Sequence, residues 1–173
     1  MMTSVIRPEM IGDYASISKV NDLAFSQKNE GRLILALRKT REFIPELSLV
    51  AVVGGRVVGH ILFYPTKIKS NDASYGSLSL APMAVLPEYQ KQGIGSRLVE
   101  EGLKKARRLG FKSVIVLGHA AYYPRFGFEP AGKWSIRPPF EVPDDVFMAL
   151  ELVKDGLKDI QGTVEYPPEF NDV

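Results

Sequence analysis

The stretch "MAVLPEYQKQGIGSRLVEEGLKKARRLG", residues 83–110, determines the fold class, because it runs from an apolar strand through a glycine turn into an amphipathic helix. A helix is predicted over residues 96–109, with Gly110 placed to end it in a left-handed cap. One side of this helix is apolar, at Leu98, Val99, Leu103, Ala106 and Leu109. A strand, a turn and a packed helix in this order predict an α/β protein.

The turn "QKQGIG", residues 90–95, has two interpretations. The N–H groups at the start of a helix lack intrahelical partners and the helix dipole favours anions, so the turn is a candidate pyrophosphate site. Gly93 and Gly95 have no Cβ atom to obstruct a close approach, and Lys91 adds positive charge. The alternative is a tight turn that uses glycine for packing. The chain lacks a G-x-G-x-x-G third glycine and a G-x-x-x-x-G-K-[ST] pattern, which argues against NAD chemistry and nucleotide hydrolysis.

The rest of the chain predicts strands and helices around a central sheet. Two helices come early: Asp13 is expected to cap the first, with Ile17, Val20 and Ala24 on one face, and the second starts near Asn29. Strands are expected at residues 4–8, 47–53, 56–65, 77–86, 113–118, 146–153 and 162–170, with Gly54 and Gly55 forming a hairpin turn and Pro82 causing a bulge or a parting of strands. This order predicts a mixed α/β sandwich.

Composition narrows the class of protein. The chain has 173 residues, of which 45% are apolar and 24% charged, so we expect a single domain over residues 1–173. A net charge of +2 gives no support to a dedicated nucleic-acid binder. Without cysteine, and with His60 and His119 as its two histidines, the chain has no thiolate nucleophile and no His-rich metal cluster. No signal peptide or membrane span is apparent, so we expect a metal-free cytoplasmic protein.

Two motifs resemble those of the GNAT superfamily of N-acyltransferases. The first is the acyl-CoA-binding signature [Q/R]-x-x-G-x-[G/A] after a strand, in which Gln90, Gly93 and Gly95 occupy the defined positions. The second is the Tyr-x-x-x-Gly-Phe element in "YYPRFGF", residues 122–128, beginning at Tyr123. The resemblance covers roughly residues 3–131, leaving the chain from about residue 132 as a carboxyl-terminal extension. Among its branches, the bacterial YhbS-type acetyltransferases look most similar.

The resemblance implies a fold, a co-substrate and a reaction. The fold is a mixed central sheet of about six to seven strands flanked by helices, with a splayed strand pair that admits the acyl-pantetheine arm. The co-substrate is acetyl-CoA, with no metal, and a primary amine attacks the thioester directly. The backbone N–H of Val85 would bind the thioester carbonyl, and Tyr123 would protonate the departing thiolate as general acid. Coenzyme A would contact Met83, Ala84, Val85, Gln90, Lys91, Gln92, Gly93, Ile94, Gly95 and Ser96.

Two departures from the family pattern leave the general base unassigned. Residues 77–86 contain no Asp or Glu, and "VLGHAAYY" lacks the asparagine that many relatives carry. His119 can orient substrate or relay a proton, with a structural histidine as the plainer alternative. Glu30, Glu88 and water are other candidate bases. His60 alternates with apolar neighbours and is expected to be structural.

Several residues and hypotheses keep two interpretations. Arg125 can reach coenzyme A phosphates or lie in solvent, and Tyr122, Phe126 and Phe128 are expected to pack. A non-catalytic acyl-CoA-binding or sensing module is the main alternative to an enzyme, followed by an interaction domain that has lost its ligand. The expected partner is a small-molecule or peptide amine, with no nucleic acid and no membrane, and a homodimer remains open.

Overall fold

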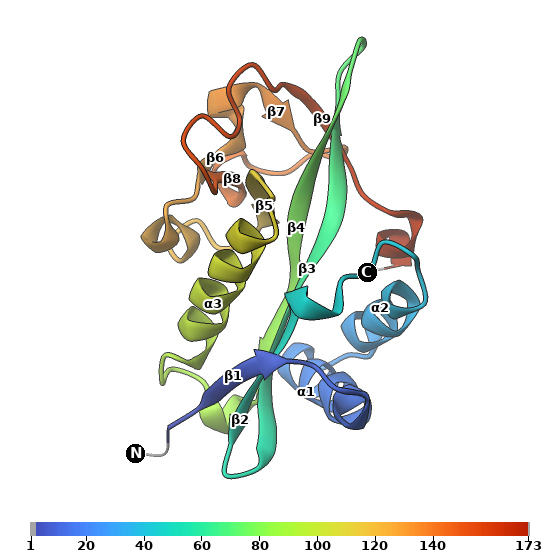
Figure 1. Cartoon of the computed structure of the whole chain (residues 1–173), viewed down its shortest axis with the longest axis vertical. Helices are drawn as coiled ribbons and strands as arrows, with labels where there is room; N and C mark the ends of the chain where they lie inside the picture. The colour runs from blue at the N-terminus through green and yellow to red at the C-terminus, as the bar shows by residue number, and fades with distance from the viewer. Residues whose placement is uncertain (1–2, 173) are drawn as a thin grey trace. The chain divides into compact units, whose positions relative to one another are not determined.

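The computed structural model describes residues 3–172 and is shown in Figure 1. The chain divides into two compact units. The first comprises Met1–Tyr64, Ala81–Lys105 and Pro168–Val173, and the second comprises Pro65–Leu80 and Ala106–Pro167. The assignment of residues 1–173 to a single domain stays a prediction.

Nine strands are formed by residues 3–172. They are β1 (Val5–Pro8), β2 (Ser48–Val53), β3 (Arg56–Lys69), β4 (Ser74–Val85), β5 (Ser113–Leu117), β6 (Glu129–Pro130), β7 (Ile136–Arg137), β8 (Phe147–Glu151) and β9 (Gly162–Glu165). Hydrogen bonds connect them in the order β1-β2-β3-β4-β5-β8-β6, while β9 pairs with β3 and β7. The pairs β4–β5 and β7–β9 are parallel, and β1–β2, β2–β3, β3–β9, β5–β8 and β6–β8 are antiparallel. The predicted mixed α/β fold is therefore confirmed, with β6 and β7 as additional two-residue strands.

In the first unit, opposite faces of β3 are covered by different helices. A Cβ atom built on Gly59 would lie 3.1 Å from Leu98 and 3.3 Å from Ile94, so this face is covered by α3 (Ile94–Arg108). Because side chains alternate along a strand, His60 and Tyr64 point to the other face, where His60 meets Asn21 of α1 (Tyr14–Phe25). The Tyr64 hydroxyl lies 2.5 Å from that of Thr40, just after α2 (Asn29–Arg38). The glycine turn leads into α3, the helix that covers the Gly59 face of β3.

The predicted helices and hairpin are confirmed in the first unit. Gly54 and Gly55 have φ of 55° and 79°, as a two-residue turn with two left-handed positions requires. The apolar stripes of the two early helices are buried at Ile17, Val20, Leu33, Ile34 and Leu37. Burial of such a stripe, more than helix propensity, stabilises helices of this length.

In the second unit, a separate apolar core lies between β5, β8 and β9. Buried members are Ile68, Ile115, Ala131, Ile136, Phe147, Ala149, Leu157 and Val164. Parallel pairing of β4 with β5 joins Leu78 to Val114 and Ser79 to Ile115. Five antiparallel pairs between β5 and β8 then run from Ser113–Glu151 to Leu117–Phe147. This core ties the carboxyl-terminal extension to β5.

Two local expectations were wrong. Asp13 occupies the N-cap of α1 but makes no side-chain cap bond there, because its carboxylate instead accepts from Arg7 and from the N–H of Met10. The long helix begins at Ile94, two residues before the predicted start, and ends at Arg108, so that Leu109 lies just beyond it and is 43% exposed. Strand β4 continues through Pro82, which follows a cis peptide bond, but its pairing with β5 ends at Ser79–Ile115 although β5 runs on to Leu117, in agreement with the predicted parting of strands.

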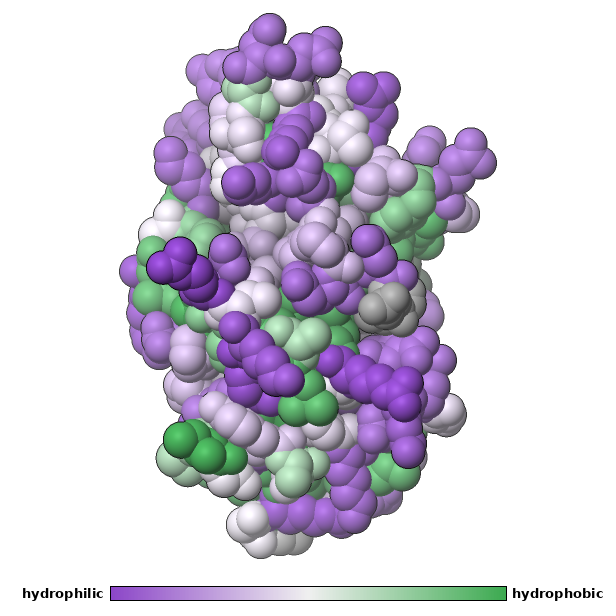
Figure 2. All heavy atoms as spheres, turned by 90° about the vertical axis from the view of Figure 1, so that its right-hand side faces the viewer, coloured by the Kyte–Doolittle hydropathy of each residue, from purple (hydrophilic) through white to green (hydrophobic). Residues whose placement is uncertain are grey.

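Apolar side chains are also exposed on α1 and α2. Figure 2 shows the face of the molecule on which these helices lie, with apolar patches scattered among polar ones. Leu23, Phe25 and Leu35 are 39–46% exposed. Separate exposed apolar residues are common on monomers and do not define a docking surface. Within residues 3–172, none of the helices is long and apolar enough to cross a membrane.

Candidate active site

The glycine turn forms the junction between β4 and α3 in the first unit. After Val85 the chain passes through a 3-10 turn at Pro87–Tyr89, an extended Gln90, and then two residues with left-handed backbone, Lys91 (φ 62°) and Gly93 (φ 85°). A Cβ atom on Gly93 would meet nothing within 4 Å, so glycine is needed there for its backbone conformation rather than for space. The first helical hydrogen bond follows at once, from the Arg97 N–H to the Gly93 carbonyl at 3.1 Å.

The side chain of Gln90 locks this turn to the end of the strand. Its Nε2 donates to the carbonyl of Val85 at 2.9 Å. The next N–H, that of Leu86, donates to the Val58 carbonyl of β3 at 2.8 Å. Because an extended chain alternates the direction of its peptide groups, the N–H of Val85 points away from β3. Two predicted site residues, Val85 and Gln90, are thus brought into direct contact.

Tyr123 lies in the second unit, in a short 3-10 turn at Tyr123–Phe126 that follows β5. Its side chain is nearly buried and its ring makes edge contacts with Tyr122 at 5.1 Å and Phe128 at 5.6 Å between centroids. Desolvation by burial, with a smaller effect of Tyr122, raises the pKa of Tyr123 to about 12. An ordinary phenol, with a pKa of about 10, and an ordinary thiol, with a pKa of about 8.5, differ by less than two units. Burial of Tyr123 widens this difference, because it favours the neutral phenol.

The neighbours of Tyr123 adopt packing roles. Tyr122 contacts both Tyr123 and Phe126, and Phe128 is buried, as predicted. Arg125 lies over the Tyr122 ring at 4.5 Å and donates from Nε to the Tyr122 carbonyl at 2.9 Å. The carbonyl of the exposed His119 accepts the N–H groups of Tyr122 and Tyr123, so its backbone shapes the turn.

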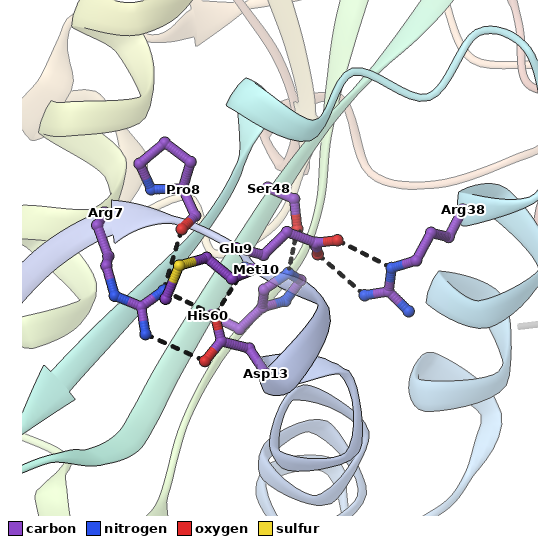
Figure 3. A network of polar contacts seen from close by, with 8 residues as sticks. All are labelled: Arg7, Pro8, Glu9, Met10, Asp13, Arg38, Ser48 and His60. Carbon is purple, nitrogen blue, oxygen red and sulfur yellow. Dashed lines mark hydrogen bonds and ion pairs between the residues drawn. The ribbon is translucent and has the colours of Figure 1, made fainter.

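A buried polar network occupies the α1 and α2 side of β3 in the first unit (Figure 3). His60 is fully buried, with its Nε2 atom 2.9 Å from Ser48 Oγ and its Nδ1 atom 3.4 Å from Asn21 Nδ2. Ser48 donates to Glu9 at 2.5 Å, and Glu9 accepts two bonds of 2.9 Å from Arg38. The structural role predicted for His60 is confirmed.

These contacts fix the direction of each hydrogen bond. Asn21 Nδ2 also donates to the Ile17 carbonyl, so the amide presents its NH₂ group to Nδ1 of His60. Nδ1 therefore accepts, Nε2 carries the proton and donates to Ser48, and Ser48 donates to the Glu9 carboxylate. Desolvation, with a smaller effect of the Arg38 charge, lowers the pKa of His60 to about 3. The histidine is thus neutral at pH 7.

Other carboxylates of the first unit are also engaged. Glu30 is buried and accepts two bonds from Gln27, while the exposed Glu88 pairs with Arg56 at 3.3 Å. Arg7 lowers the pKa of Asp13 through a hydrogen bond, opposed by desolvation. Sequence reasoning missed the Glu9 and Asp13 pairs. Asn21, a polar residue four positions after Ile17 on a buried stripe, was the available signal for a polar network there, although no network was predicted from it.

Across residues 3–172, no group of three or more His, Asp or Glu side chains is arranged to hold a metal ion. The candidate groups are a backbone turn at a helix start and an internal polar network in the first unit, and a buried tyrosine in the second unit.

Comparison with known proteins gives consistent matches. Residues 17–128 match the Acetyltransferase (GNAT) family. The chain is 42% identical to the uncharacterized N-acetyltransferase YjhQ of Escherichia coli K12 over 134 residues, which cover 77% of this chain and 74% of YjhQ. It is 33% identical to the uncharacterized N-acetyltransferase YhbS of the same strain over 168 residues, covering 96% of this chain and 98% of YhbS.

Two solved structures resemble the whole chain. The crystal structure of Escherichia coli YhbS in complex with CoA matches with a TM-score of 0.91 and 31% identity, covering 99% of this chain and 93% of YhbS. A GNAT family acetyltransferase from Brucella melitensis in complex with acetyl-CoA matches with a TM-score of 0.79 and 34% identity, covering 98% and 99% of the two chains.

Proposed function

Because the chain belongs to the GNAT acetyltransferase family, we propose that it transfers an acetyl group from acetyl-CoA to a primary amine by direct attack. The observation that carries the proposal is the glycine turn, in which a left-handed Gly93 leads into α3 and Gln90 is bonded to Val85. Such a turn offers backbone N–H groups and a helix dipole to a pyrophosphate. The complexes of the two similar proteins with CoA and acetyl-CoA support the same donor.

The donor site follows from the turn and the strand that precedes it. The pyrophosphate lies against residues 91–96, and Lys91, which is exposed, contributes positive charge at the rim. The pantetheine arm runs along Met83, Ala84 and Val85. Val85 presents its N–H to the thioester carbonyl, and the Gln90 bond to the carbonyl of Val85 fixes the next peptide group and thereby the orientation of Val85.

The reaction requires no nucleophile from the protein. The neutral amine attacks the thioester carbon, the new C–N bond forms as the C–S bond breaks, and the amine nitrogen gives up one proton while the thiolate gains one. Tyr123, kept in its phenol form by burial, donates its proton to the departing sulfur and recovers one from solvent. The general base is unassigned, and solvent water takes the amine proton in this scheme.

A thiol-release assay with acetyl-CoA across a panel of small amines and peptides tests the proposal. The wild-type chain should release coenzyme A with at least one acceptor, and Tyr123→Phe should lower kcat by about 10²-fold or more while leaving acetyl-CoA affinity largely intact. Equal turnover by the two proteins on the best acceptor would remove Tyr123 from the mechanism.

A non-catalytic acyl-CoA-binding or sensing module is the second candidate. It is favoured by the absence of Asp and Glu from β4 within residues 77–86 and by the engagement of Glu30 and Glu88 with other side chains. Acetyl-CoA binding by calorimetry, together with no thiol release from any acceptor, would support this candidate over the enzyme.

The proposal also includes the domain organisation, location, acceptor class and assembly of the protein. Residues 1–173 act as one N-acetyltransferase domain in the cytoplasm, where a free acyl-CoA pool meets amine acceptors. The acceptor is a small molecule or a peptide, and a homodimer is an assembly to test by light scattering.

A further inference from the structure

Gly118 follows the last residue of β5, five residues before Tyr123, and lies against its ring. A Cβ atom built on Gly118 would lie 2.4 Å from Cε2 and 2.9 Å from Cδ2 of Tyr123. Real Cβ atoms do not approach carbon this closely, so the ring occupies the space that a side chain would fill. Gly118 is not among the glycines with positive φ, so its backbone conformation does not require glycine.

The backbone of Gly118 is held in place. Its N–H donates to the Val146 carbonyl at 2.9 Å, next to the pair Leu117–Phe147 of the β5–β8 ladder. An added methyl group therefore cannot be accommodated by moving residue 118 without breaking this end of the sheet.

The Tyr123 ring is also confined on its other sides. Phe128 and Tyr122 meet it edge-on at interplanar angles of 76° and 86°. The N–H of Tyr123 bonds to the His119 carbonyl at 3.3 Å, which folds the turn back on the strand end. The turn that carries Tyr123 has fewer backbone hydrogen bonds than the β5–β8 ladder that holds residue 118. When a methyl group is added at residue 118, the Tyr123 ring therefore moves before the strand does.

We propose that Gly118 is a positioning residue, which by lacking a Cβ atom sets the plane in which the Tyr123 phenol is held. This inference rests on the proposed function of Tyr123 as proton donor. A methyl group at residue 118 displaces the ring by roughly an ångström, and a displacement of that size lowers the rate of an aligned step by about 10²-fold. Gly118→Ala should therefore reduce kcat by about tenfold to a hundredfold while changing the KM for acetyl-CoA little.

A double-mutant cycle separates positioning from loss of stability. A phenylalanine ring at this position meets the same Cβ atom, so Gly118→Ala should lower Tm equally in wild type and in Tyr123→Phe. Turnover should fall in the wild-type background but not further in Tyr123→Phe. Gly132→Ala is the matched control, since a Cβ there meets nothing within 4 Å, and it should leave kcat unchanged. Equal fold losses of kcat in both backgrounds would overturn the proposal.

A second measurement does not depend on activity. In protein labelled with ¹³C-tyrosine, the ring signal of Tyr123 is the one absent from Tyr123→Phe among the seven tyrosines. It should shift in Gly118→Ala and not in Gly132→Ala, and an unshifted signal would overturn the proposal. If Gly118→Ala folds poorly, Gly118→Ala/Phe128→Leu gives the ring room: Tm should recover while kcat stays low, and recovery of both would contradict positioning.

Failure of the Gly118 role and failure of the proposed function give different results. If wild type releases thiol and Gly118→Ala has the same kcat, Gly118 is not a positioning residue, but the proposed acetyltransferase activity is unaffected. If the wild-type chain transfers an acetyl group to no acceptor, the proposed function is contradicted, whether or not the Tyr123 ring signal shifts in Gly118→Ala.

Discussion

His60 should make the protein less stable in mild acid. Its pKa is lowered from 6.5 to about 3 in the folded chain, mainly because burial disfavours the charged ring. The unfolded chain therefore takes up a proton below pH 6.5 that the folded chain refuses until about pH 3, so stability is fully present above pH 6.5 and is lost as the pH falls. The loss amounts to about 2 kcal/mol between pH 7.5 and pH 5 and about 5 kcal/mol when complete.

Urea unfolding at pH 7.5 and pH 5 measures this loss. His60→Gln, which keeps a polar side chain but cannot titrate, should lower the free energy of unfolding at pH 7.5 and flatten the difference between the two pH values. His119→Gln is the matched control, because it removes the exposed histidine and keeps the buried one. The stabilising contribution of Asp13, whose pKa is lowered by Arg7, is lost only as the pH falls below its ordinary pKa of 3.8, outside this interval. A wild-type protein equally stable at both pH values would show that His60 does not titrate in this way.

Three further perturbations test the packing of the first unit. Ser48→Ala removes the hydroxyl between His60 and Glu9 and should cost about 1–3 kcal/mol in urea unfolding, while an unchanged midpoint would show that the network contributes nothing. Gly102→Ala places a Cβ 2.3 Å from the Phe63 ring and should destabilise the fold by about 1–3 kcal/mol by calorimetry, whereas Gly76→Ala, which meets nothing within 4 Å, should have little effect. Gly93→Val should lower the free energy of unfolding by about 1–2 kcal/mol, because valine is strained in a left-handed backbone. It should also weaken acetyl-CoA binding in titration calorimetry more than Gly93→Asn does, because asparagine tolerates that backbone. Equal affinities of the two variants would contradict a conformational role.

The parts of the fold that sequence predicts best are those fixed by local rules. Gly54 and Gly55 form the expected hairpin, and Gly110 ends α3 with φ of 92°. Hydrophobic periodicity located α1, α2 and α3 because each buries one stripe. The strands β6 and β7, of two residues each, carry no periodic signal and were missed.

The hydrogen-bond partners in the buried polar network could not be predicted from the sequence. Glu9 meets Arg38 and Ser48 across 29 and 39 positions, and no periodic pattern identifies such partners. Asp13 was misassigned as a cap because Arg7, six positions earlier, competes for its carboxylate. The raised pKa of Tyr123 depends on burial by Tyr122 and Phe128, which is a tertiary property. At the candidate site, the motif predicted the glycine turn but not the Gln90–Val85 bond.

The decisive test of acetyl transfer is coenzyme A release from acetyl-CoA by the purified chain in the presence of a primary-amine panel, with Tyr123→Phe measured alongside. We predict acceptor-dependent release by wild type and a fall of about 10²-fold or more in kcat for the variant, at similar acetyl-CoA affinity. Tight acetyl-CoA binding without acceptor-dependent release from any amine would contradict an acetyltransferase.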